Sequence, residues 1–194
     1  MASKPRHNES CKECKTRVEE LLSVIFGEVK QGYGLNISSR LEGFKDTPYY
    51  DCLSEIFELL QKYRGHTSFI HRKRLPNVDF FVPFPGFVFE YDESQHFTKP
   101  REISLCHYPG HIKMRFDKER WLCFCRELHK KDNSPLYRDE QRAWYDTLRD
   151  FAPYILGLKP TVRVFARDLV WCSLQISSKE DIQTFSEIIG GKYG

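Results

Sequence analysis

The sequence lacks any apolar run approaching the roughly 20 residues that a membrane-spanning helix needs. Its N-terminal segment, MASKPRHNESCKECK, is polar and has no hydrophobic stretch of the signal-peptide kind. Internal repeats and low-complexity segments are also missing. We therefore expect a cytoplasmic protein with no signal peptide and no membrane partner.

A large excess of charge of one sign is also lacking, because the formal net charge is only +3. That balance permits a nucleic-acid partner without indicating one. The seven cysteines are odd in number, which favours reduced thiols over a disulfide framework. The 40% hydrophobic and 14% aromatic content excludes a disordered chain, and 194 residues suffice for one domain with a genuine core.

Hydrophobic periodicity and helix start signals predict an α/β fold, with a mixed sheet of four to five strands flanked by helices. The expected helices are 11–26 (after a Ser10–Glu13 capping box), 48–64, 118–131, 134–150 and one beginning after Ser178. The expected strands are 67–73, 77–83, 86–93 and 161–168, with 171–174 as a further candidate. Residues 27–46 are expected to form a long loop.

These elements suggest a division within one compact domain. Residues 1–46 would form an N-terminal helix and loop, and residues 47–194 the α/β core. Residues 98–131 would be an inserted loop and helix. The oligomeric state is left open, with a homodimer as one arrangement.

Three carboxylates, Asp79, Glu90 and Asp92, stand in the two β-rich runs between Asn77 and Phe97. A hairpin turning near Phe84 and Pro85 would place Asp79 opposite Glu90 and put all three acids on one face of the sheet. Directly opposed like charges, with Cβ atoms roughly 5 Å apart, are destabilising unless a cation compensates them. A hard divalent metal ion is the simplest such cation. The alternative is a solvated strand end that carries a few acids.

Basic and polar residues flank this acidic hairpin. Gln95 and His96 follow it, and the run from His71 to Arg74 precedes it. Acidic ligands beside cations suit metal-assisted hydrolysis of a phosphodiester.

The pattern DFF…EYDESQH, from Asp79 through Glu90 and Asp92 to His96, resembles the PD-(D/E)XK nuclease superfamily. It is most similar to the branch of the very-short-patch mismatch-repair endonucleases. The resemblance covers about residues 51–168. It includes an acidic helix, LSEIFELLQKY, before the first strand, and a later helix and strand with Asp139, Arg142 and Arg167.

The resemblance implies a restriction-endonuclease-like core and a metal-dependent endonuclease acting on DNA, with RNA as the alternative substrate. Asp79 and Glu90 would bind Mg²⁺ or Mn²⁺, with the Tyr91 carbonyl as a third ligand. Asp92 would hold a second metal ion or orient His96, which would be a general acid/base or contact the phosphate. Outer carboxylates would come from Glu55 or Glu58, for which a solvated helix face is the alternative.

The chain departs from the family pattern at three positions. Asp92 stands where most members have a lysine, Glu93 replaces the usual glycine, and Val78 replaces the proline before the first Asp, although Pro76 is close. Another group must then orient or activate the water, and the candidates are His96, Gln95 and Lys73.

Basic residues beyond the hairpin are candidates for contacts with the nucleic-acid backbone. They could equally be a solvated loop and helix face. The candidates are Arg72, Arg74, Lys99, Arg101, Lys113 and Arg115.

Cys11 and Cys14 have the C-x-x-C spacing of half a zinc site. The other half would have to come from distant residues, because no second C-x-x-C exists. The distant residues considered are Cys52, Cys106, His107, Cys123 and Cys125.

Three hypotheses follow for function. The first is a Mg²⁺-dependent endodeoxyribonuclease. The second is a nucleic-acid-binding protein of the same fold whose catalysis is impaired by the lost lysine. The third is an interaction domain stapled by zinc.

Overall fold

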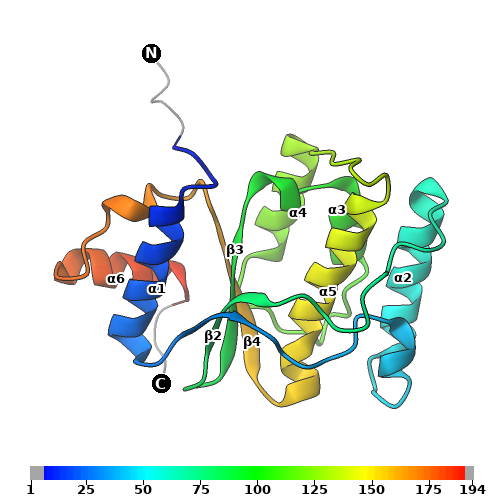
Figure 1. Cartoon of the computed structure of the whole chain (residues 1–194), viewed down its shortest axis with the longest axis horizontal. Coiled ribbons are helices and arrows are strands. Elements are labelled where there is room, and N and C mark those ends of the chain that lie inside the picture. Colours follow the sequence, from blue (N-terminus) through cyan, green and yellow to red (C-terminus); the bar gives the residue numbers. More distant parts are fainter. Residues whose placement is uncertain (1–6, 191–194) are drawn as a thin grey trace.

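A mixed four-stranded sheet, in the order β1-β2-β3-β4, runs through the centre of the molecule (Figure 1). The computed structural model describes residues 7–190. Strands β1 to β3 are antiparallel neighbours, and β4 lies parallel to β3. The strands are β1 (Lys30–Tyr33), β2 (Val78–Val82), β3 (Phe87–Asp92) and β4 (Lys159–Phe165). This confirms the expected α/β class with a mixed sheet.

Helices cover both faces of the sheet (Figure 1). They are α1 (Lys12–Phe26), α2 (Tyr50–Arg64), α3 (Lys99–Cys106), α4 (Lys118–Leu128), α5 (Arg138–Leu156) and α6 (Lys179–Ile188). Helices α1 and α6 lie on one side, α3, α4 and α5 on the other, and α2 is outermost beyond α5. Because both faces are covered, all residues of β3 are buried. No described helix is long and apolar enough to cross a membrane.

The hairpin of β2 and β3 has the register that the sequence predicts. Phe80 pairs with Phe89, and Val82 pairs with Phe87. Gly86 closes the turn with φ +88°, a left-handed conformation that side chains with a Cβ rarely adopt. Extending this register by one residue places Asp79 opposite Glu90.

The core is divided between the two faces of β3 by strand alternation. Its odd-numbered residues face α1 and α6: the ring of Phe87 meets Phe26 of α1, and that of Phe89 stacks near Phe185 of α6. Its even-numbered residues include Glu90 and Asp92, which face α5 and its arginines. The acids therefore lie in the polar layer between the sheet and α5.

Several predicted helix boundaries are confirmed. Helix α1 ends at Gly27, and α2 ends at Gly65 in the left-handed conformation. Asp117 caps α4 and Ser178 caps α6, each accepting a backbone N–H. Helix α5 begins four residues later and ends six residues later than the predicted range of 134–150.

The predicted capping box and two predicted strands are wrong. Cys11, not Ser10, stands at the start of α1, and no side chain caps that helix. Residues 67–73 form no strand, because Gln61 and Gln141 side chains take the carbonyls of Thr67 and Phe69. Residues 171–173 form a 3₁₀ turn, η3 (Trp171–Ser173).

The edge of the sheet is occupied instead by β1, within the segment 27–46 that the sequence predicts as a loop. Strand β1 has the sequence KQGY and is largely exposed, so it carries almost no hydrophobic signal. Strand β1 forms because it pairs with β2, and not because of its own composition.

Candidate functional site

Asp79 and Glu90 adjoin across the β2–β3 hairpin. The Asp79 N–H donates to Glu90 Oε1 at 3.3 Å, and the Tyr91 N–H donates to Asp79 Oδ2 at 2.9 Å. The Glu90 side chain is buried, whereas that of Asp79 is 28% exposed. Burial raises the pKa of Glu90 to about 7, with Arg149 opposing the rise and Asp79 adding to it. The pair is thus open to solvent on the Asp79 side and buried on the Glu90 side.

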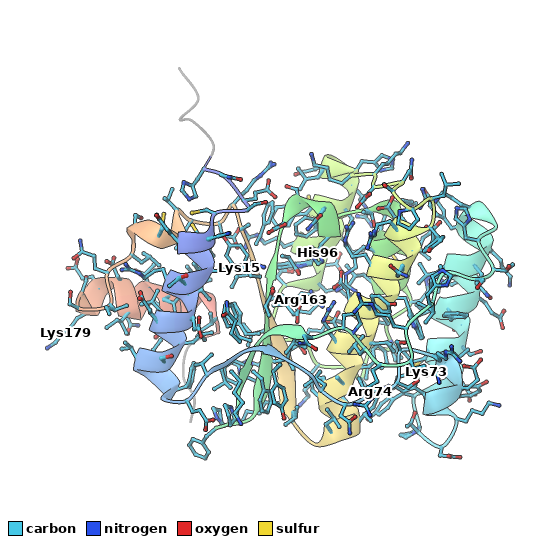
Figure 2. The ribbon with its side chains drawn as sticks, viewed as in Figure 1. Lys15, Lys73, Arg74, His96, Arg163 and Lys179 are labelled. Atoms are coloured by element: carbon cyan, nitrogen blue, oxygen red, sulfur yellow. The ribbon has the colours of Figure 1, made fainter. Side chains whose placement is uncertain are left out.

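Two cations from different helices approach these acids. Lys15 Nζ of α1 lies 3.1 Å from Asp79 Oδ1, and Arg149 Nε of α5 lies 3.4 Å from Glu90 Oε1. The Arg149 Nε is buried and makes no hydrogen bond, so its contact with Glu90 is purely electrostatic. Figure 2 shows Lys15 reaching from α1 toward the sheet.

Asp92 is committed to a buried ionic network. Its two oxygens accept hydrogen bonds from Arg163 at 2.7 Å and from the Trp121 indole at 2.8 Å. Arg163 also donates to Asp150, at 2.8 Å. Because its side chain is only 1% exposed and both oxygens are occupied, Asp92 does not fit the expected role of a second-metal ligand.

His96 does have the contacts expected of an oriented histidine. Its Nδ1 lies 2.8 Å from Asp146 Oδ2 of α5 and 3.6 Å from Asp92 Oδ1. Burial by itself would lower the pKa of His96, but the Asp146 and Asp92 carboxylates outweigh it and the pKa is raised. Of the two acids, Asp146 makes the closer contact.

A pocket rich in arginine opens beside His96 and α5. The residues that line it are Arg72, Pro76, His96, Arg138, Gln141, Arg142, Tyr145 and Arg149. No acid lines the pocket, although two of its arginines pair with acids beside it: Arg142 with Asp132, and Arg149 with Asp146 and Glu90. The pocket thus presents guanidinium groups and a histidine to an entering ligand. Such a set matches the oxygens of phosphate groups.

The structure separates Lys73 from the acidic hairpin. Figure 2 shows Lys73 beside α2, on the far side of α5 from Lys15. The predicted strand 67–73 would have placed Lys73 next to the hairpin, but these residues form no strand. Gln95 does stay close to the site, but its amide donates to Glu93 and its carbonyl accepts from Arg142. Neither residue is placed to activate a water at Asp79 and Glu90.

Glu55 and Glu58 lie on exposed positions of α2. Glu58 pairs with Lys62 on the same helix, at 3.2 Å. Because α2 is the outermost helix, these acids lie away from the hairpin, on a solvent-exposed face of α2.

The predicted nucleic-acid-binding residues differ in exposure and in whether another group of the protein already binds them. Arg101 is buried and bonds to Asp150 and Tyr108, so it is not available to a nucleic acid. Arg115 donates to the Ile189 carbonyl, and Lys99 pairs with Glu102. Arg74 and Lys113 are exposed, and only Arg72 of the set lines the arginine pocket.

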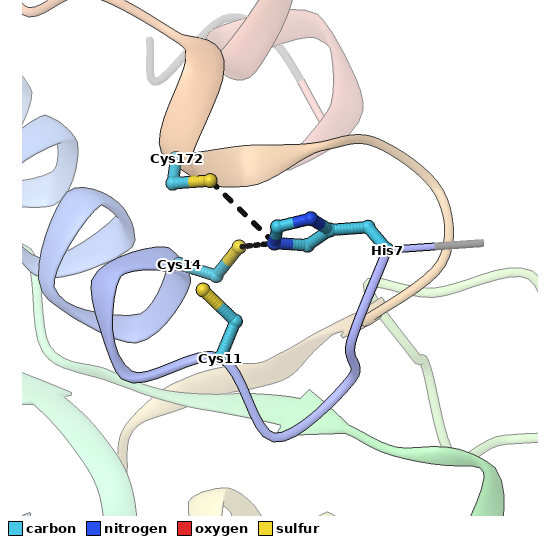
Figure 3. Close-up of side chains that lie close together, drawn as sticks. All are labelled: His7, Cys11, Cys14 and Cys172. Carbon is cyan, nitrogen blue, oxygen red and sulfur yellow. Dashed lines mark hydrogen bonds between the residues drawn. The ribbon is translucent and has the colours of Figure 1, made fainter. Parts of the chain in front are cut away.

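Cys11 and Cys14 meet His7 and Cys172 near the start of α1 (Figure 3). None of the residues proposed from the sequence as the other half of a zinc site joins them. Cys52 donates to the Tyr49 carbonyl, and Cys106 and Cys123 are exposed on other helices.

Sequence reasoning missed several residues of the site. Lys15 and Cys172 are brought in by tertiary packing and leave no local signal. Arg149 could have been found, because Asp146 and Arg149 repeat the D-x-x-R spacing of Asp139 and Arg142 two helical turns later. The repeat continues on one face of α5, and its second copy is the one that contacts Glu90 and His96.

Comparisons with protein-family models, with curated proteins and with solved structures found no match to this chain. Function is therefore inferred from the geometry of the site and from its chemistry.

Proposed function

We propose that this protein is a metal-dependent endonuclease that hydrolyses phosphodiester bonds of DNA. The observation that carries the proposal is the Asp79–Glu90 pair with the Lys15 ammonium 3.1 Å from Asp79. Two adjoining carboxylates and a lysine are the groups that the PD-(D/E)XK pattern combines. Here the lysine comes from α1 instead of the strand that carries Glu90.

The donor set at the hairpin fits a hard divalent ion. Asp79 and Glu90 present carboxylate oxygens, the ligands that Mg²⁺ and Mn²⁺ prefer, and Tyr91, whose carbonyl would be a third ligand, directly follows Glu90 in the sequence. Burial, with Asp79 adding to its effect, raises the pKa of Glu90, so a bound cation would favour the charged form of this acid. A bound ion would supply positive charge to stabilise the negative charge that develops on the phosphate.

Lys15 takes over a role that Asp92 cannot fill. Asp92 is an acid at the usual lysine position, and it is held by Arg163 and Trp121. The Lys15 ammonium stands beside Asp79 and is one-third exposed, so it can orient a water or a phosphate oxygen there.

The arginine pocket would bind the DNA backbone. Arg72, Arg138 and Arg142 reach it from the segment before β2 and from α5. His96 lines the same pocket, and Asp146 fixes the orientation of its ring and helps to raise its pKa against the effect of burial. A protonated His96 can donate that proton to the phosphate or to the leaving oxygen.

Cleavage of supercoiled plasmid DNA tests the proposal. Wild-type protein should nick it with Mg²⁺ or Mn²⁺ and not with EDTA. Asp79→Asn and Glu90→Gln should each reduce the rate at least about a hundred-fold, because each removes a charged ligand. Glu58→Gln is the matched control, since Glu58 is an exposed acid on α2. Wild-type nicking rates in both hairpin variants would refute the assignment. The same assay on single-stranded RNA tests the alternative substrate.

A second function, binding of nucleic acid without catalysis, is favoured by the same two cations. Lys15 and Arg149 supply two positive charges to the two acids, so the pair has partners without a metal ion. Calorimetric titration distinguishes the two functions. Binding of Mg²⁺ or Mn²⁺ that disappears in Asp79→Asn supports the nuclease. Retained DNA binding with no metal binding at millimolar concentration supports the second function.

A further inference from the structure

Four metal-ligating side chains converge from distant parts of the chain (Figure 3). His7 precedes α1, Cys11 and Cys14 lie at its start, and Cys172 lies in η3. Their ligand atoms all lie within 4.8 Å of one another, although His7 and Cys172 are 165 positions apart. Among the residues that the structure describes, this is the one such group of histidine, cysteine or acid side chains.

The spacing of these atoms matches a tetrahedral metal site. His7 Nε2 lies 3.1 Å from Cys14 Sγ and 3.5 Å from Cys172 Sγ. In a tetrahedral zinc site with Zn–S of about 2.3 Å and Zn–N of about 2.0 Å, neighbouring ligand atoms lie about 3.5–3.8 Å apart. The four side chains would therefore need only small shifts to enclose an ion.

The donor set selects the metal. Three thiolates and one imidazole are soft ligands that favour Zn²⁺ over Mg²⁺ or Ca²⁺. Four protein ligands complete the tetrahedron and leave no position for a substrate, which is the pattern of structural zinc sites. We propose that His7, Cys11, Cys14 and Cys172 bind one Zn²⁺ as a closed structural site.

The site joins the start of the described chain to η3, on the side of the sheet that α1 and α6 cover. The helices that cover the sheet face away from α5 are α1 and α6, which are 15 and 10 residues long (Figure 1). Trp171, beside the ligand Cys172, packs against Tyr91 of β3 and Phe185 of α6. Cross-linking α1 to η3 would stabilise this small layer, because an ion bound only in the folded state adds its binding free energy to folding.

The zinc site would also position Lys15 at the proposed active site, and this consequence rests on the proposed function. Lys15, which contacts Asp79, directly follows the ligand Cys14. Glu9, between the ligands His7 and Cys11, accepts hydrogen bonds from the Ser94 N–H and from Arg167. The segment that carries the zinc ligands is thus the one that brings Lys15 to the acidic hairpin.

Metal analysis of the full-length protein tests the zinc site independently of activity. Protein purified without chelators should contain about one zinc per chain by mass spectrometry. Replacement by Co²⁺ should give the visible bands of a tetrahedral ion and thiolate-to-cobalt charge-transfer absorption in the near ultraviolet. Iron with acid-labile sulfide, or neither zinc nor cobalt binding, would overturn the proposal.

Matched variants show which residues bind the ion. Cys172→Ser and His7→Ala should each lower the zinc content well below one per chain and lower the melting temperature. Cys106→Ser and Cys123→Ser, which remove exposed cysteines outside the cluster, should leave both unchanged. Because His7 lies outside the helices and strands, before α1, the His7→Ala variant should still fold if Cys172→Ser does not. Full zinc content in both ligand variants would refute the ligand assignment.

A combined variant tests whether the zinc site acts through Lys15. If it does, Lys15→Ala in the His7→Ala background should cause little additional loss of DNA cleavage, whereas Arg72→Ala should still add its full effect. Additive losses for Lys15→Ala would refute this link and leave the zinc site itself supported by its metal content. Zinc binding without any DNA cleavage would refute the nuclease and not the zinc site.

Discussion

The ammonium of Lys15 lies 3.1 Å from a carboxylate oxygen of Asp79, although 64 positions separate the two residues in the chain. Helix α1 crosses the sheet face opposite α5 and delivers this cation to the open edge of the acidic pair (Figure 2). The contact joins a helix outside the expected core to the residues at its centre, and it is the basis of the first prediction.

Lys15→Ala should lower the rate of DNA cleavage by about a hundred-fold, the usual effect of removing one stabilising charge from an active site. The same change should tighten Mg²⁺ binding, because Lys15 no longer competes for Asp79. Plasmid nicking and calorimetric titration measure the two effects. Lys12→Ala is the control, since Lys12 is an exposed lysine on the same helix. Unchanged cleavage in Lys15→Ala would exclude a role for this lysine.

Arg163→Ala should destabilise the fold by about 3–5 kcal/mol. Arg163 is fully buried and bridges Asp92 and Asp150, so its loss removes a charged partner from each of two buried carboxylates. Denaturation with urea measures the free energy of unfolding. Arg120→Ala is the control: Arg120 pairs with Asp168 at the surface, and its loss should cost about 1 kcal/mol or less. Equal effects of the two substitutions would contradict the importance of the buried network.

The stabilising effect of His96 should fall as pH rises. Its pKa in the folded protein is raised above the unfolded value of about 6.5 by Asp146 and Asp92, so the folded state binds the proton more tightly. The contribution is complete below about pH 6.5 and is lost as pH rises through the folded pKa. The difference in unfolding free energy between wild type and His96→Gln should therefore be larger near pH 5.5 than near pH 8.5. If the difference in unfolding free energy does not change with pH, the predicted contribution of protonated His96 is wrong.

Arg72→Ala should weaken DNA binding, and Arg74→Ala should not. Arg72 lines the arginine pocket, whereas Arg74, two positions later, is exposed outside it. Loss of one phosphate contact should also reduce the slope of log affinity against log salt by about one unit. Fluorescence anisotropy with a labelled duplex at several salt concentrations measures both. Equal losses in the two variants would indicate general electrostatic attraction rather than a defined pocket.

The fold could be predicted wherever one element carries its own pattern. The helices α1, α2, α4 and α6 have apolar stripes with clear start or stop residues, and the β2–β3 hairpin has alternation and a Phe-Pro-Gly turn. Strand β1 could not be predicted, because its exposed polar residues become a strand only by pairing with β2. Residues 67–73 have the composition of a strand, but glutamine side chains donate to the carbonyls of Thr67 and Phe69, and Ser39 donates to those of Arg72 and Lys73.

The sequence by itself determined the acidic hairpin, because a tight turn and the two-residue period of strands decide which residues oppose each other. For that local reason Asp79 and Glu90 lie next to each other. The burial of Phe80 and Phe89 has the same local cause. Only the tertiary structure decided what surrounds the pair. The contacts of Lys15 with Asp79, of Arg149 with Glu90 and of Cys172 with His7 depend on how helices pack on the two faces of the sheet. Those contacts span long stretches of chain, and no local spacing encodes them.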